Sequence, residues 1–169
     1  MLRIALALLV LAGSVSAVPA REFVAHEKDF KCLLEGKSVE GKTFFVFHRN
    51  RRKLRKALKI ARRDLSSKRY PVGTILQLFP FEAMVKRGGN FNPEGNGWEF
   101  FQLTASAQGT HIVTRGGAEV ANRFGGSCQG CHDAARSFDF VCEGHGAAAL
   151  PIPPDVIRAL QVDPRCQPR

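Results

Sequence analysis

The chain has 169 residues, of which 44% are hydrophobic and 24% are charged, and its formal net charge is +10. These values fit one ordinary globular domain, and the lack of any internal repeat or low-complexity stretch excludes a repeat protein. Behind residues 1–20 no apolar run is long enough to cross a bilayer, so we expect no integral membrane span in the mature chain.

The N-terminus has the pattern of an export signal. A short positive start, Met1–Arg3, precedes the apolar segment Ile4–Gly13, and small residues follow at Val15–Ala17. The apolar segment is too short to span a membrane. We therefore expect residues 1–20 to be a signal peptide, cleaved near 17–20, and the mature protein to be periplasmic or secreted. An uncleaved membrane anchor is the alternative.

The remainder divides into one domain, 21–150, and a C-terminal tail, 151–169, which contains a short helix near 155–162. Runs of β-branched and aromatic residues predict strands, and Gly-rich or Pro-containing segments between them predict turns. In chain order, the predicted strands are 43–48, 74–79, 98–103, 110–114 and 138–141. These patterns predict a mixed, sheet-rich domain of the α+β class.

One predicted helix, 51–65, has an apolar stripe on one side and a cationic outer face. The stripe consists of Leu54, Ala57, Leu58, Ala61 and Leu65. Between Arg49 and Arg69 there are 11 Lys or Arg residues and one acid, Asp64, so the basic charge of the chain is concentrated here. Such a face suits an acidic redox partner or an anionic lipid surface. A solvated face without a partner is the alternative.

The most specific motif is Cys128–His132, with the sequence Cys-Gln-Gly-Cys-His. C-x-x-C-H is the attachment pattern of a c-type haem. We therefore expect the thiols of Cys128 and Cys131 to form thioethers with the haem vinyl groups and His132 to bind the iron as its proximal ligand. Ser127 is a suitable N-cap for a short helix here. The alternatives are a turn closed by a disulfide and half of a zinc site, although the sequence has no second ligand pair at metal spacing.

Three cysteines lie outside the motif, Cys32, Cys142 and Cys166, and an odd number cannot all form disulfides with one another. In an oxidising compartment two of them can form a disulfide and one stays free. The sequence does not choose among the three pairings.

A sixth iron ligand would make the protein an electron carrier. Met84 is one candidate, and it would raise the reduction potential. The other candidates are His48, His111 and His145. For each histidine the alternative is a surface or hydrogen-bonded position away from the iron.

Several segments, taken in their order and spacing over roughly residues 40–142, carry a resemblance to a known family. These segments are Tyr70-Pro71-Val72-Gly73-Thr74, Glu82-Ala83-Met84-Val85-Lys86, Gly97-Trp98-Glu99-Phe100, the haem motif and Phe138-Asp139-Phe140-Val141. The chain resembles the cytochrome P-460 and cytochrome c′-β family. The resemblance implies a curved antiparallel β-sheet with a few helices, a homodimer, and one haem c attached near the C-terminal end with an open distal side.

The resemblance also assigns roles to individual positions. P-460 enzymes oxidise hydroxylamine or related nitrogen species and carry a lysine cross-linked to the porphyrin. The matching position is Leu78, so we expect no cross-link, with Lys86 as the substitute candidate. Cytochrome c′-β members lack the cross-link and bind nitric oxide in an apolar pocket. Glu82 matches a distal carboxylate that takes protons from the substrate. Candidate aromatic residues of the haem pocket are Phe44, Phe45, Phe79 and Phe81.

The sequence thus predicts an exported mono-haem cytochrome with an open iron site that binds nitric oxide, hydroxylamine or peroxide. As an enzyme it would oxidise the bound nitrogen ligand. The alternative is a six-coordinate periplasmic electron-transfer cytochrome. Nucleic-acid binding is not expected of an exported haem protein.

Overall fold

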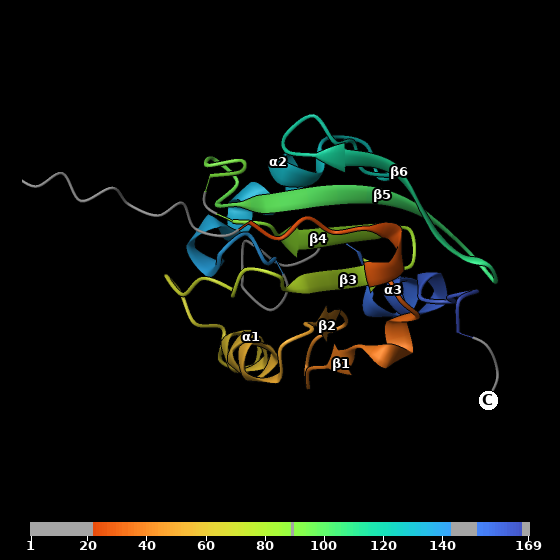
Figure 1. Ribbon diagram of the computed structural model, residues 1–169, viewed down its shortest axis with the longest axis horizontal. Coiled ribbons are helices and arrows are strands. Elements are labelled where there is room, and N and C mark those ends of the chain that lie inside the picture. The colour runs from red at the N-terminus through yellow and green to blue at the C-terminus, as the bar shows by residue number, and fades with distance from the viewer. Residues whose placement is uncertain (1–21, 89, 143–151, 167–169) are drawn as a thin grey trace, which may run out of the picture.

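The computed structural model describes residues 22–88, 90–142 and 152–166. The predicted signal peptide 1–20 and His145 lie outside the described residues. The fold is α+β, as predicted, and its centre is a six-stranded antiparallel sheet with the strand order β1-β2-β3-β4-β5-β6 (Figure 1). The strands are β1 Lys37–Ser38, β2 Phe45–Phe47, β3 Ile75–Phe79, β4 Glu82–Lys86, β5 Trp98–Ser106 and β6 Gly109–Gly116.

Three α-helices accompany the sheet. They are α1 Arg51–Arg63, α2 Cys128–His132 and α3 Pro154–Leu160. Short 3-10 helices lie at Glu27–Asp29, Leu33–Glu35 and Asp133–Phe138. Among the described residues, none of these helices is both long and apolar enough to pass through a bilayer.

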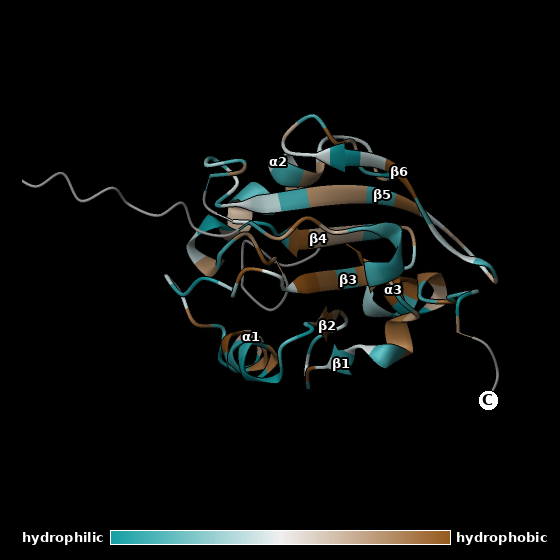
Figure 2. Cartoon of the chain, viewed as in Figure 1, coloured by the Kyte–Doolittle hydropathy of each residue, from teal (hydrophilic) through white to brown (hydrophobic). Residues whose placement is uncertain are grey.

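Alternating side chains of β3, β4 and β5 form two apolar clusters, because successive residues of a strand point to opposite faces. Leu76, Met84 and Phe100 belong to one cluster, which also contains α1 and α2 residues. The other cluster combines two residues of the N-terminal segment, Ala25 and Phe30, with sheet residues Ile75, Val85, Phe101 and Leu103. Figure 2 shows the brown central strands and the teal outer surface of α1.

Helix α1 begins where Asn50 caps it. The Asn50 side-chain oxygen accepts hydrogen bonds from the backbone N–H groups of Arg52 at 2.9 Å and Lys53 at 3.1 Å. The helix ends at Asp64, whose left-handed backbone (φ 46°) stops it. The predicted stripe of the 51–65 helix is confirmed, because Ala57 and Ala61 are buried and its three leucines pack against the same core cluster. Ile60, which was not in the predicted stripe, is buried as well.

Two sequence predictions differ from the structure. Strand β4 was not among the predicted strands, but a two-residue turn at Pro80 and Phe81 returns the chain as a hairpin partner of β3. The predicted strand 138–141 is wrong. Asp139 and Phe140 instead adopt left-handed φ values of 56° and 64°, which no strand tolerates.

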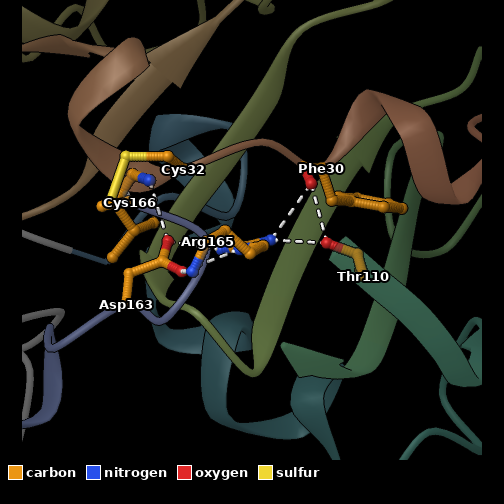
Figure 3. Close-up of a disulfide and its surroundings, with 7 residues drawn as sticks. Phe30, Cys32, Thr110, Asp163, Arg165 and Cys166 are labelled. Carbon is orange, nitrogen blue, oxygen red and sulfur yellow. Dashed lines mark hydrogen bonds and ion pairs between the residues drawn. A yellow bond between two sulfur atoms is a disulfide. The ribbon is translucent and has the colours of Figure 1, made fainter. Parts of the chain in front are cut away.

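The disulfide joins Cys32 to Cys166, so the buried free thiol outside the haem motif is Cys142. Figure 3 shows how neighbouring groups hold this junction. The Asp163 carboxylate accepts a hydrogen bond from the Leu33 N–H at 2.9 Å. It also forms an ion pair with Arg165 at 2.7 Å. Cys32, Cys166 and Asp163 lie close enough together to resemble a set of metal ligands. However, the two sulfurs are bonded to each other and the carboxylate already has its partners, so these residues do not form a metal site.

Candidate functional site

A cavity of about 720 Å³ lies between the sheet and the segment that contains the haem motif. Its volume falls in the range of ordinary cofactor pockets, roughly 300–1,000 Å³. The wall on the sheet side contains Phe44, Leu76, Leu78, Phe79, Ala83, Met84, Phe100 and Phe101. The facing wall contains Phe124, Ser127, Cys128, Cys131, His132, Val141 and Cys142, and Ile152, just before α3, also lines the cavity. The lining is mainly apolar, as a porphyrin requires of its surroundings.

Helix α2 turns both motif thiols toward this cavity. The Ser127 hydroxyl caps the helix by accepting the Gly130 N–H at 2.9 Å. Residues three apart lie on the same side of a helical turn, so Cys128 and Cys131 both line the cavity. Burial raises the pKa of Cys128 to about 12, which keeps its thiol protonated at neutral pH.

His132 is oriented by a backbone carbonyl. Its Nδ1 lies 2.6 Å from the Phe140 oxygen, and because a carbonyl only accepts, Nδ1 carries the hydrogen. The other ring nitrogen, Nε2, is therefore the one with a lone pair for a metal. Burial lowers the pKa of His132, which favours the neutral imidazole that binds metals. A histidine that binds a metal through one ring nitrogen usually donates a hydrogen bond from the other ring nitrogen to a carbonyl or carboxylate, as His132 does here.

The Phe140 carbonyl is in turn positioned by Asp139. The Asp139 carboxylate forms an ion pair with Lys86 Nζ at 2.6 Å and accepts the Tyr70 N–H at 2.7 Å. The Asp139 carbonyl accepts the Trp98 indole N–H at 2.6 Å. These contacts explain the left-handed corner at Asp139 and Phe140, which brings the Phe140 oxygen to His132.

Sequence reasoning missed this supporting group. Asp139 and Trp98 were quoted only as family landmarks, and no local pattern indicated that they meet. Lys86, considered for a porphyrin cross-link, is not among the residues that line the cavity. Its ammonium group is held by Asp139 and by the Asn96 carbonyl, at 2.6 Å each. The free thiol of Cys142 lies 3.4 Å from His132 Nδ1, a contact that the sequence also did not indicate.

Glu82 lies at the start of β4 and lines the same cavity. Its carboxylate accepts the Arg123 N–H at 3.1 Å. Burial raises the pKa of this carboxyl above its ordinary value, with the Arg123 contacts opposing the shift. Glu82 is therefore a group that can hold or accept a proton beside the cavity.

The other sequence candidates divide into two sets. Leu78, Phe44, Phe79 and Met84 line the cavity, whereas Phe45 and Phe81 are not among its lining residues. The Phe81 ring stacks on Phe79, with 5.0 Å between centroids, and carries the Arg123 guanidinium at 4.3 Å. Phe81 thus supports the wall from behind.

Two of the candidate histidines lie away from the cavity. His48 Nε2 contacts the Val72 carbonyl at 3.1 Å, and burial lowers the pKa of His48. His111 contacts the Glu27 carboxylate at 2.8 Å on an exposed part of β6. Neither is among the residues that line the cavity.

No family model matches this chain, and neither does any curated protein or solved structure. The candidate site therefore rests on its own geometry, in which the two motif thiols, the Cys142 thiol, one oriented imidazole and the Glu82 carboxyl face a single apolar cavity.

Proposed function

We propose that this chain is an exported c-type haem protein whose iron has one protein ligand and an open opposite side for a small nitrogen ligand. The observation that carries the proposal is the convergence of Cys128, Cys131 and His132 on one apolar cavity, with His132 Nδ1 already bonded to a carbonyl. Export rests on the pattern of residues 1–20, and the homodimer rests on the family resemblance alone.

The residues present fit a haem. Cys128 and Cys131 would hold the porphyrin through thioethers, and His132 Nε2 would bind the iron. When bound, the haem supplies a redox-active iron that binds small ligands. The apolar wall, with Leu78 in it, would exclude water from the open side, which favours a small uncharged ligand such as nitric oxide or hydroxylamine.

The six-coordinate alternative depends on Met84. Among the described lining residues, Met84 is the side chain on the sheet wall with a sulfur that can bind iron. His48 and His111 are held elsewhere by Val72 and Glu27, which disfavours both as sixth ligands.

An optical spectrum of the ferrous, haem-loaded protein before and after addition of nitric oxide tests the proposal. We expect a broad five-coordinate spectrum that shifts on addition. Sharp six-coordinate bands that do not respond to nitric oxide would refute the open site and favour an electron carrier with Met84 as ligand. A strongly red-shifted Soret band would indicate a cross-linked porphyrin, contrary to Leu78 at the matching position.

An enzymatic role is a second candidate, and the position of Glu82 in the cavity favours it. Because its pKa is raised, Glu82 stays protonated to a higher pH than an ordinary carboxyl and acts as a base only above that pKa. We expect hydroxylamine oxidation to rise with pH through this ionisation. Glu82→Gln should remove that inflection and slow the reaction by roughly 10²-fold.

The matched control for this experiment is Glu94→Gln, which neutralises an exposed acid that does not line the cavity. It should leave both the rate and the pH profile unchanged. If Glu82→Gln oxidises hydroxylamine at the wild-type rate, Glu82 has no part in the reaction.

A further inference from the structure

The outer face of α1 and the segment behind it carry a dense group of positive side chains, which we call the basic face. Its ten exposed members are Arg51, Arg52, Lys53, Arg55, Lys56, Lys59, Arg62, Arg63, Lys68 and Arg69. The acid of this stretch, Asp64, forms an ion pair with Lys42 at 2.7 Å. Within the described part of the chain, no member of the basic face forms an ion pair.

This arrangement of positive charges destabilises helix α1. The first turn of α1 contains three cations and no acid, although the helix dipole favours negative charge at that end. Like charges also face one another at a spacing of four residues, as between Arg55 and Lys59 or between Lys59 and Arg63, and such pairs destabilise a helix. The described residues provide no ion pair to any member of the basic face, and a partner with negative charge would compensate these repulsions.

The basic face lies next to the candidate haem cavity. The inner side of α1 contributes Ile60 and Ala61 to the cluster that contains Phe44 and Val141. Phe44 and Val141 also line the cavity. A partner bound to the outer side of α1 would therefore be separated from the cavity by about one helix diameter, roughly 10 Å, and one layer of side chains.

The chemistry of the face favours a soluble acidic protein over a bilayer. A helix that inserts into a membrane surface presents apolar side chains to the lipid. Here the apolar side of α1 is packed on the core, with Ala57, Ile60 and Ala61 buried. The exposed large apolar side chains of the described residues lie outside α1, at Val24, Leu34, Val113, Phe124, Val156 and Val162.

We infer that the basic face is the docking surface of an acidic electron-transfer protein that exchanges one electron with the haem. This inference rests on the proposed haem function. With a haem bound, the partner's one-electron centre would lose the one electron that the haem iron gains, or would gain one when the protein delivers electrons. The positive face steers the acidic partner to the side of the molecule that lies closest to the cavity wall at Phe44 and Val141.

A stopped-flow experiment tests the docking surface with a reduced plant-type ferredoxin, a small acidic iron–sulfur protein, as the probe. The variant Arg55→Gln/Lys59→Gln/Arg62→Gln removes three charges from one side of α1 with a residue that favours helices, so the fold is expected to persist. We expect its bimolecular reduction rate to be at least about tenfold below wild type at low ionic strength. The difference should vanish at high salt.

The matched control is Lys28→Gln/Lys37→Gln/Arg158→Gln, which removes three exposed cations outside the basic face. It should react within about twofold of wild type, because steering depends on where the charge lies. Equal losses in the two triple variants would overturn the inference, since net charge alone would then explain the rate. A wild-type rate that does not depend on salt would overturn it as well.

Two further measurements separate the remaining outcomes. Binding of oxidised ferredoxin to the full chain, measured by titration calorimetry without any electron-transfer readout, should weaken with the α1 triple substitution, and an unchanged affinity would overturn the inference. This binding measurement does not depend on the haem, so it still tests the docking surface if the proposed haem function is wrong. Sedimentation with anionic vesicles tests the lipid alternative. Vesicle binding that depends on α1, without an α1-dependent reduction rate, would overturn the inference in favour of a membrane surface.

Discussion

Replacing Cys128 and Cys131 together with alanine is expected to abolish covalent haem attachment. Both thiols line the cavity from adjacent turns of the same short helix, so each is placed to form one thioether. Without them the haem can be held only by His132 and apolar contacts, which acid or denaturant would break. The measurement is haem staining on a denaturing gel, supported by a pyridine haemochrome spectrum of material expressed with a cytochrome c maturation system.

Cys142→Ala is the matched control for this experiment. Cys142 is also a buried thiol of the cavity wall, but it lies outside the motif, 3.4 Å from His132 Nδ1. We expect the Cys142 variant to keep its covalent haem. Retention of covalent haem by the double variant, or its loss only in the Cys142 variant, would contradict the proposed attachment.

Removing the Cys32–Cys166 disulfide is expected to lower the free energy of unfolding by about 5 kcal/mol, the chain-entropy estimate for a loop of this length. The two cysteines are 134 residues apart, so the cross-link restricts almost the whole described chain when it unfolds. Hydrogen bonds also hold the segment that contains Cys166 against the rest of the folded protein. Arg165 donates to the Phe30 carbonyl at 3.1 Å and to the Thr110 hydroxyl at 2.8 Å.

Urea denaturation of Cys32→Ser/Cys166→Ser, followed by circular dichroism, measures this loss. Cys142→Ala again serves as control, because it removes a cysteine but leaves the disulfide. Wild-type protein treated with a reductant should unfold at the same urea concentration as the double variant. A midpoint that neither reduction nor substitution changes would show that the disulfide does not stabilise the fold.

Local sequence patterns predicted the elements whose structure depends on near neighbours. The apolar stripe of the 51–65 helix and the two strands of the β5–β6 hairpin correspond to observed elements. Strand β4 was not predicted, because Pro80 reads as a strand end whereas it begins a tight turn. The strand predicted at 138–141 failed for a different reason. Its alternating aromatic pattern was overridden by the distant contacts of Asp139 with Lys86, Tyr70 and Trp98.

By itself, the sequence determined the local geometry of the haem motif, since a spacing of three residues puts both thiols on one side of a helical turn. It also determined that the positive charge gathers on one helix, because charge and apolar periodicity are both local properties. Only the tertiary structure decided which side chains oppose the motif. Leu78 and Glu82 belong to the local β3–β4 hairpin, which is far from the motif in sequence, and the packing of distant segments brings both to one cavity. The tertiary structure likewise decided the disulfide partners and the support of His132 by the Asp139 corner, because both depend on how distant segments pack together.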